Sequence, residues 1–373
     1  MKKILFIMNN LGGGGAERVL IDILNTFDYS KYEVDLFLVN CEGVYLNEVN
    51  ENVKIYKMYG DKHFKNRHLE HLYLNLKYRL LKHFPELMYK LFIKKTYDVE
   101  IAFLEGFPCT YLLAHSTNRE SKKIAWVHTD LSKSDAISEE DASRIYSKID
   151  KFICVSKDSE IVFKKLYPYA KDKVKVIYNL IDKETIIKKS NKKLDISKEL
   201  PTIVSVGRLV KLKRFDILIR VHKLLLEEGI KNTLIIVGAG EEESELKALI
   251  RELELEESVE MQGFKSNPYP YIKASDIFCM ASDFEGFSLV VAEALILGKP
   301  IVSTSCVGPI ELLNNGEYGI LTECGDVEGL KEELKKLILS EDRRKYYSEK
   351  SLERSSIFQK ERIMKEIYEV IET

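Results

Sequence analysis

The sequence predicts an α/β protein made of two doubly wound domains, each a parallel sheet covered by helices. The chain has 373 residues, which is long for a single hydrophobic core and suits two domains of ordinary size. Short apolar runs alternate throughout with segments of helical periodicity, as they do in parallel sheets. A stretch rich in Lys and Glu over residues 183–200 has no strand character and predicts a linker between the domains.

Short apolar runs predict the strands. In the first domain, over residues 1–182, they lie at 3–8, 34–39, 99–104, 123–127, 151–155 and 174–177. In the second domain, over residues 201–355, they lie at 202–206, 234–237, 259–261, 276–280, 300–303 and 319–321. In the segment 356–373, apolar residues recur at near-helical spacing, which predicts an amphipathic helix that completes the first domain.

The composition argues against several classes of protein. Hydrophobic content of 45% and charged content of 31% are typical of a soluble globular protein, and no apolar stretch approaches the length of a membrane span. The six cysteines are scattered without a Cys-x-x-Cys pair, as in a cytosolic protein with reduced thiols. No His cluster or Asp-x-Asp loop has metal-ligand spacing, so we expect no metal and no cofactor.

The loop after the first predicted strand carries four consecutive glycines, Gly12, Gly13, Gly14 and Gly15, directly before a helical pattern. Glycines let a backbone approach a ligand closely, and a helix N-terminus favours an anion. A dinucleotide-binding fold needs an acidic residue where the second strand ends, but Asn40 stands there, which weakens a NAD interpretation. The loop lacks the Gly-Lys-Ser/Thr of an ATPase, and a tight turn without a ligand remains the alternative.

Two loops of the second domain follow consecutive predicted strands. The first, over residues 207–216, places Arg208 at the strand end and Lys213 just before a helix, where both cations could reach a diphosphate. The second is the turn from Gly238 to Gly240, which we expect to line the same rim of the sheet. The alternative is that the basic loop is simply solvated.

Two carboxylates, Glu285 and Glu293, stand eight positions apart in the sequence. Glu293 is the only polar residue within the nine from Leu289 to Leu297, so we expect it to be at least partly buried. A carboxylate in such a place needs a partner, and the neighbouring hydroxyls of a sugar or ribose are donors that it can accept. The alternative is a helix whose Glu faces solvent or a nearby Lys.

His128 follows the apolar run 124–127, at a predicted strand end. A lone His is more often structural than functional, but a strand end in an open parallel sheet is where ligands bind. Glu105 occupies the analogous place after the strand at 99–104 and is a weaker candidate.

In this order along the chain, these motifs resemble those of the retaining glycosyltransferases of family 4, over nearly the full length. The most specific element is Glu285-x7-Glu293. The others are the glycines before Arg18, the segments 179–182 and 303–311, the loop with Arg208 and Lys213, and the turn 238–240. The resemblance implies the GT-B architecture, in which two Rossmann-like domains face a central cleft.

The resemblance also implies a role for each candidate residue. Arg208 and Lys213 would hold the donor diphosphate without a divalent cation, Glu293 would bind the ribose hydroxyls, and Glu285 would contact the donor sugar near its reacting carbon. His128 would approach the sugar's hydroxymethyl side, although here Thr129 follows it where many relatives have Asp directly. The remaining donor-binding residues would be Gly14, Gly15, Gly238, Gly240, Gly286, Phe287, Ser288 and Leu289.

The segment 62–95 is basic and aromatic, with nine Lys and Arg against two Asp and Glu. A basic, helix-prone segment with interleaved aromatic residues can lie on an anionic membrane surface. The alternative is a helical insertion whose lysines are solvated. Nucleic acid is a poor partner, because the rest of the chain is not basic.

These observations lead to one functional hypothesis and two alternatives. We expect a retaining hexosyltransferase that moves a sugar from a nucleotide-diphosphate donor, with UDP favoured by family frequency, to a cell-envelope, polysaccharide or lipid-linked glycan. Its expected location is the cytoplasm or, peripherally, the inner face of the plasma membrane. The alternatives are a nucleotide-sugar epimerase of the same architecture and a sugar-nucleotide-binding protein with lapsed catalysis.

Overall fold

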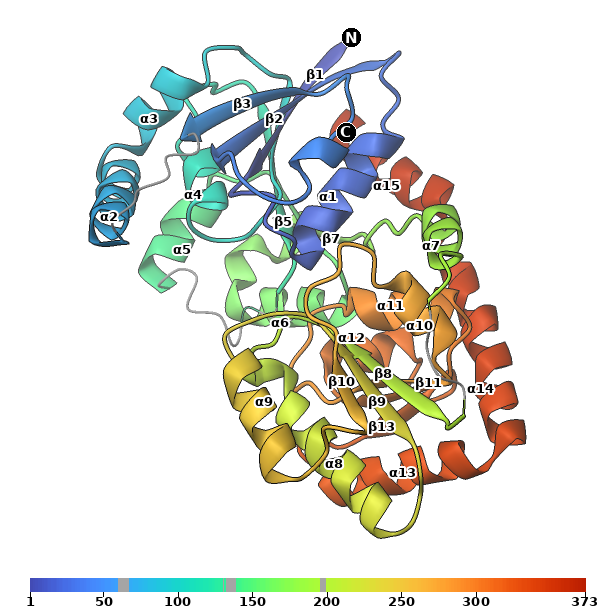
Figure 1. Ribbon diagram of the computed structural model, residues 1–373. Coiled ribbons are helices and arrows are strands. Elements are labelled where there is room, and N and C mark those ends of the chain that lie inside the picture. The colour runs from blue at the N-terminus through green and yellow to red at the C-terminus, as the bar shows by residue number, and fades with distance from the viewer. Residues whose placement is uncertain (60–66, 130, 132–138, 195–198) are drawn as a thin grey trace. The chain divides into compact units, whose positions relative to one another are not determined.

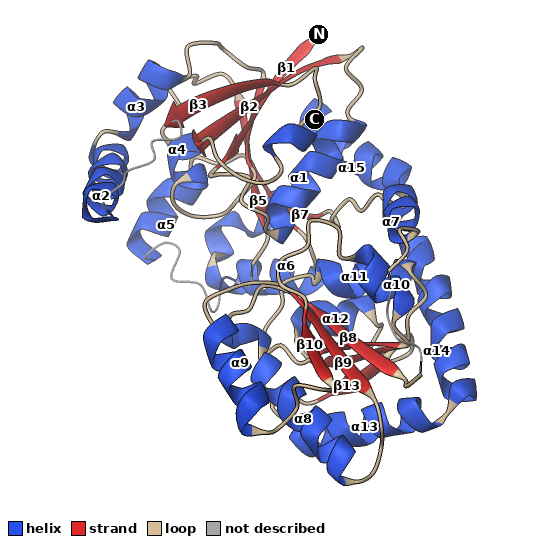
Figure 2. Cartoon of the chain, in the orientation of Figure 1, coloured by secondary structure: helices blue, strands red, loops and turns tan. Residues whose placement is uncertain are grey.

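The structure is a computed structural model, which describes residues 1–59, 67–129, 131, 139–194 and 199–373. The chain forms two compact units, one of residues 1–181 with 360–373 and the other of residues 182–359. Each unit has a central sheet with helices on its faces, drawn as red arrows and blue coils (Figure 2).

The sheet of the first unit is fully parallel, with the strand order β3-β2-β1-β4-β5-β6-β7. Its strands are β1 (Lys2–Met8), β2 (Tyr32–Asn40), β3 (Lys54–Tyr59), β4 (Val99–Ala102), β5 (Lys122–Val127), β6 (Lys151–Cys154) and β7 (Val174–Val176). Its helices are α1 (Gly15–Thr26), α2 (Arg67–His83), α3 (Pro85–Phe92), α4 (Cys109–Ala114), α5 (Glu139–Tyr146), α6 (Lys157–Leu166) and α15 (Lys360–Glu372).

Both faces of this sheet are covered, which explains the continuous apolar runs of its central strands. Leu5 and Ile7 of β1 face a core that includes residues of α3 to α6. On the opposite face, the ring of Phe6 meets that of Phe27 at the end of α1, with centroids 5.9 Å apart. The sequence analysis missed β3, because this edge strand is mostly exposed and has no apolar run.

Helix α15 belongs to the first unit, as the amphipathic pattern predicted. Figure 1 shows it in red beside α1 in blue. The Lys2 ammonium donates to the carbonyl of Ile371 at 3.0 Å, and the Tyr368 hydroxyl accepts from the Asp28 N–H at 2.9 Å. The Tyr368 ring also stacks on that of Tyr32, with centroids 5.1 Å apart.

The second unit has a parallel sheet with the order β10-β9-β8-β11-β12-β13. Its strands are β8 (Thr202–Val206), β9 (Thr233–Val237), β10 (Val259–Met261), β11 (Ile277–Met280), β12 (Ile301–Thr304) and β13 (Ile320–Thr322). Its helices are α7 (Lys183–Ser190), α8 (Phe215–Glu227), α9 (Glu243–Glu252), α10 (Tyr269–Ala274), α11 (Leu289–Ile296), α12 (Val307–Leu312), α13 (Val327–Leu339) and α14 (Glu341–Arg354). The prediction of doubly wound parallel sheets is confirmed.

The segment predicted as a linker is largely helical where the structure describes it, since α7 occupies residues 183–190. Asp182 caps this helix by accepting from the Thr185 N–H at 3.0 Å, and Ile186 is buried. Lys and Glu favour helix, so a charged run without strand character did not have to be a linker. Residues 195–198 of the predicted linker lie outside the described part of the chain.

Candidate functional site

Both sheets reverse their strand order at the first strand of the unit. β1 lies between β2 and β4, and β8 lies between β9 and β11. Open parallel sheets bind ligands beyond the carboxyl ends of the strands at such a reversal. The candidate ligand-binding loops are therefore those that follow β1 and β4 in the first unit, and β8 and β11 in the second.

In the second unit, the two loops bring Lys213 and Glu285 into an ion pair. Their side chains are 22% and 12% exposed, so the pair is shielded from most of the solvent yet reachable. The Ser282 hydroxyl donates to the same Glu285 oxygen at 3.2 Å, and the Asp283 N–H donates to the Leu212 carbonyl at 2.9 Å. The residues predicted to bind phosphate and sugar are thus held together at the reversal of the sheet.

The remaining cations of the β8 loop have different surroundings. Arg214 adopts a left-handed backbone conformation, with φ of 49°, and pairs with both Asp216 and Asp283. Arg208 is exposed at the end of β8 and has no ion-pair partner among the described carboxylates. Arg208 and the exposed Lys211 are therefore the cations of this loop that form no ion pair with a described carboxylate, and Arg208 is the one that lies closer to the strand end.

The turn from Gly238 to Gly240 packs directly on the loop that carries Arg208. A Cβ on Gly238 would lie 1.8 Å from the Gly207 carbonyl oxygen, and one on Gly240 would lie 2.2 Å from that of Leu209. The Leu209 N–H also donates to the Ala239 carbonyl at 3.0 Å. These contacts explain both glycines without a ligand, because close packing of the two loops requires them and fixes the position of Arg208.

The loop after Glu285 leads into α11. Phe287 is buried, and Ser288 has a left-handed backbone with φ of 66°. The Ser288 hydroxyl donates to the Met280 sulfur at 3.3 Å and does not cap the helix. The N–H groups of the first turn, which begins at Leu289 just after Gly286, Phe287 and Ser288, therefore receive no cap from the Ser288 side chain. Uncapped N–H groups at the start of a helix favour an anion.

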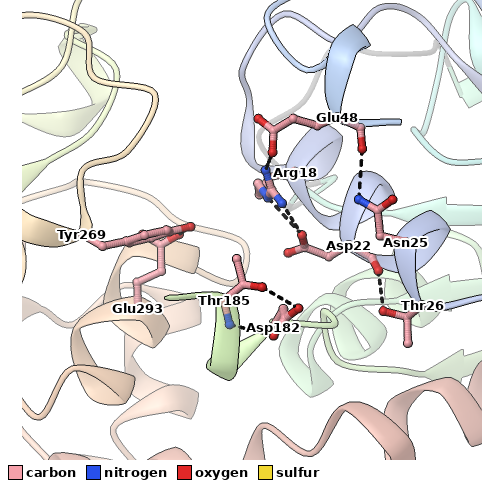
Figure 3. Close-up of polar contacts among 9 residues, drawn as sticks. All are labelled: Arg18, Asp22, Asn25, Thr26, Glu48, Asp182, Thr185, Tyr269 and Glu293. Atoms are coloured by element: carbon pink, nitrogen blue, oxygen red, sulfur yellow. Dashed lines mark hydrogen bonds and ion pairs between the residues drawn. The ribbon is translucent and has the colours of Figure 1, made fainter. Parts of the chain in front are cut away.

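Glu293 lies on α11 among buried neighbours and is itself half-buried, as predicted. The Tyr269 hydroxyl donates to its carboxylate at 3.4 Å (Figure 3). Nothing in the sequence pointed to Tyr269, which stands between two prolines on α10. Glu293 is the fifth residue of α11, so it lies about 6 Å along the helix axis from the first residue after the Glu285 loop.

Gly308 supports the Glu285 loop from the start of α12. Its N–H donates to the Glu285 carbonyl at 3.0 Å, and a Cβ there would lie only 2.6 Å from the carbonyl carbon of Phe287. The Thr304 hydroxyl donates to the Ser282 carbonyl at 2.5 Å. The sequence analysis singled out the segment 303–311 but gave none of its residues a structural role.

In the first unit, Glu105 holds the strand end that carries His128. Its carboxylate accepts from the His128 N–H at 2.9 Å and from the Thr129 hydroxyl at 2.5 Å. The His128 ring lies 4.9 Å from that of Phe103, and its Nε2 is buried without a hydrogen-bond partner among the described residues. Burial lowers the pKa of His128 to about 4, although the Glu105 carboxylate acts in the opposite direction.

We expect the His128 imidazole to remain neutral between pH 5 and pH 8. A histidine whose folded pKa lies below its unfolded value of about 6.5 stays uncharged in the fold until the pH approaches the lower value. Two-dimensional NMR of the histidine side chains, with His128 assigned through His128→Gln, measures this directly. A His128 resonance that titrates with a midpoint near pH 6.5 would contradict the expectation.

The glycine loop after β1 leads to Gly14, the N-cap of α1, and Gly15, its first residue. The neighbouring segment 42–48 fixes this loop, because the Leu11 N–H donates to the Glu42 carbonyl at 2.9 Å and a Cβ on Gly43 would lie 2.0 Å from the Leu11 carbonyl. The same segment is tied to α1 through Arg18, which bonds to Glu48 and to Asp22 (Figure 3).

Asn40, which stands where a NAD-binding fold needs an acid, has a structural role. Its side-chain amide donates to the Asn9 side chain at 3.1 Å and to the Tyr78 hydroxyl at 3.0 Å. Asn9 directly precedes the glycine loop, so Asn40 ties that loop to α2.

Among the described residues, no three His, Cys, Asp or Glu side chains are grouped so that they could hold a metal ion. No helix in the same part of the chain has the length and apolar character to cross a membrane.

Comparison with known families finds two models that together cover most of the chain. The model for Glycosyltransferase Family 4 matches residues 13–185, and the model for Glycosyl transferases group 1 matches residues 186–354. The boundary between the matches lies close to the boundary between the two units.

Individual relatives include enzymes of bacterial glycan synthesis. The N-acetylgalactosamine-N,N'-diacetylbacillosaminyl-diphospho-undecaprenol 4-alpha-N-acetylgalactosaminyltransferase of Campylobacter jejuni is 31% identical over 377 residues, which cover 98% of each chain. The lipopolysaccharide core biosynthesis glycosyltransferase LpsE of Rhizobium meliloti is 30% identical over 183 residues, covering 49% of this chain and 53% of LpsE.

A solved structure shares the fold over its full length. The crystal structure of HepE from Anabaena, in complex with UDP and glucose, superposes with a TM-score of 0.80 at 22% identity, covering 100% of both chains. This similarity confirms the GT-B fold class expected from the sequence.

Proposed function

Since the chain belongs to the GT4-like glycosyltransferases of the GT-B fold, we propose that it transfers a hexose from a nucleotide-diphosphate sugar with retention of anomeric configuration. The observation that supports this most is the pairing of Lys213 with Glu285 at the strand-order reversal of the second unit. That pair places a cation for phosphate beside an acceptor for sugar hydroxyls.

In this proposal the second unit binds the donor. Arg208, Lys213 and the first turn of α11 neutralise the diphosphate, so that the leaving group departs without help from a divalent cation. Glu293 accepts from the ribose hydroxyls, with Tyr269 orienting its carboxylate. Glu285 accepts from a hydroxyl of the sugar near the reacting carbon.

The first unit supplies the acceptor side and the remaining sugar contacts. His128, neutral at physiological pH, would donate to or accept from the hydroxymethyl group of the sugar, and Glu105 would position it. Gly14 and Gly15, at the start of α1, would contact the transferred sugar and its phosphate in this proposal.

We favour a UDP-sugar as the donor and a lipid-linked or cell-envelope glycan as the acceptor. The structurally similar HepE was crystallised with UDP and glucose. The Campylobacter jejuni relative is named for a diphospho-undecaprenol acceptor, and LpsE for lipopolysaccharide core synthesis. Such acceptors would place the protein in the cytoplasm, in peripheral contact with the inner face of the plasma membrane.

A panel of UDP-, GDP- and ADP-sugars tests the proposal. We expect one UDP-sugar to protect the protein against heat and to be hydrolysed slowly, with the first sugar anomer released having the donor's own configuration in proton NMR. EDTA should change neither result. Conversion of the sugar while still attached to the nucleotide would identify an epimerase, and protection without hydrolysis would indicate a binding protein without catalysis.

A further inference from the structure

Helices α2 and α3 carry a concentration of exposed apolar side chains. Leu76 and Leu80 stand one turn apart on α2, Leu87 and Leu91 one turn apart on α3, and Phe84 lies between the helices. All five are between 39% and 56% exposed. They make up five of the eighteen large apolar residues that are exposed in the described part of the chain, although they fall within sixteen consecutive positions. We name these five residues the α2–α3 apolar stripe.

The stripe is surrounded by positive charge. Arg79, Lys82, Lys90 and Lys94 are exposed, and none of them forms an ion pair with a described carboxylate. Glu86 is the one acidic residue between positions 76 and 94. Apolar side chains interleaved with unpaired cations are the composition of a helix that lies on an anionic lipid surface.

The core-facing side of α2 packs against the rest of the first unit, and this packing holds the stripe in place. Lys77 is buried, and its ammonium lies 4.1 Å from the Tyr59 ring centroid and 4.0 Å from that of Tyr73. Leu81 is fully buried, and the Tyr111 hydroxyl donates to the Lys82 carbonyl at 2.7 Å. The exposed residues are therefore not poorly packed core residues, because the core-facing side of the same helix is filled by others.

Helix α2 packs against the end of the first sheet where parallel strands place their ligands. Tyr59 ends β3 and Asn40 ends β2, and both contact α2, since the Asn40 amide donates to the Tyr78 hydroxyl at 3.0 Å. The same Asn40 amide bonds to Asn9, next to the glycine loop. A surface that docked on α2 and α3 would thus lie at the end of the sheet where parallel strands place their ligands.

We propose that the α2–α3 apolar stripe is the surface by which this protein docks onto an anionic phospholipid bilayer, from which it takes its lipid-linked acceptor. The proposal rests on the transferase function proposed above. A second copy of the chain fits the stripe less well. In a two-fold interface, the four cations and one acid around the stripe of one copy would face the same four cations and one acid of the other, so like charges would repel. A lipid surface with anionic headgroups matches both the apolar residues and their charged surroundings.

Vesicle flotation with Phe84→Ser/Leu87→Ser tests the docking. Both side chains are more than half exposed, so the fold should tolerate the change. The control is Ile161→Ser/Leu339→Ser, which removes two apolar side chains of similar exposure elsewhere. We expect the wild type and the control to float with vesicles of phosphatidylglycerol and phosphatidylcholine, and the stripe variant to bind them roughly tenfold or more weakly. Equal flotation of all three proteins, or none by the wild type, would overturn the proposal.

Three further measurements distinguish lipid docking from dimerisation and from a failure of the proposed transferase function. The double variant Lys82→Gln/Lys90→Gln should bind phosphatidylglycerol vesicles more weakly than the wild type. Added salt should likewise weaken the binding of the wild type to these vesicles. Sedimentation should show the same oligomeric state for the wild type and the stripe variant, whereas a dimer lost in the variant would assign the stripe to a second copy and reject docking. Slow donor hydrolysis without lipid should be unchanged in the stripe variant. Its absence from the wild type would instead refute the transferase function.

Discussion

We expect Lys213→Ala to weaken binding of the nucleotide-sugar donor by about 30- to 1000-fold, which corresponds to roughly 2–4 kcal/mol. The substitution removes the cation proposed to meet the diphosphate. It also leaves the Glu285 carboxylate, only 12% exposed, without its ion-pair partner and next to the incoming negative charge. Both effects act in the same direction.

Isothermal titration calorimetry with UDP and with the preferred UDP-sugar measures this loss. Lys211→Ala is the matched control, because Lys211 is an exposed lysine two positions earlier in the same loop. The double variant Lys213→Ala/Glu285→Gln should recover part of the affinity for UDP, since it removes the unpaired carboxylate along with the cation. Unchanged nucleotide affinity in Lys213→Ala would show that Lys213 does not bind the donor.

The second large effect is expected at Gly308, which no ligand needs to touch. In Gly308→Ala the new methyl group would meet the Phe287 backbone at 2.6 Å, so the loop from Glu285 to Phe287 must move. Overpacking of this kind costs about 1–3 kcal/mol of stability, and a displacement of about 1 Å at a reacting centre can cost about a hundredfold in rate. We therefore expect the transfer rate to fall about a hundredfold while the protein remains folded.

Gly325→Ala provides the comparison. Gly325 has φ of +79°, so alanine there is strained, but a Cβ would meet no atom within 4 Å. In urea unfolding, Gly308→Ala should lose about 1–3 kcal/mol of stability and Gly325→Ala about 1–2 kcal/mol. Gly308→Ala alone should lose donor hydrolysis. Equal activity in the two variants would show that Gly308 matters only for packing.

The central strands of both sheets were predictable because a strand that is buried on both faces needs a run of apolar residues, and such a run is visible in the sequence alone. β1 ends in five consecutive buried apolar residues, Ile4 to Met8, and β8 is buried at each of its first four positions. β3 lacks such a run, because Lys54 and Lys57 on this edge strand face solvent. α7 was missed for a related reason: it is a short, charged helix of which Ile186 and Ser190 alone are buried.

The candidate site was predictable as a set of residues but not as an arrangement. The sequence placed Lys213 just before one helix and Glu285 in a loop before another, yet the pairing of β8 with β11 decides that they meet, and strand order is not visible in one sequence. Ser282 and Tyr269 gave no local signal. Gly238 shows the opposite case, since its conspicuous position is explained by contact with the Gly207 carbonyl.

The place of α15 affects how the protein is made. The chain leaves the first unit after residue 181 and returns to it at residue 360. On the ribosome, the surface of the first unit that receives Ile367 and Tyr368 therefore stays uncovered until the whole second unit has been translated. A nonsense mutation just before Lys360 would spare every residue of the second unit and still leave the first one incomplete.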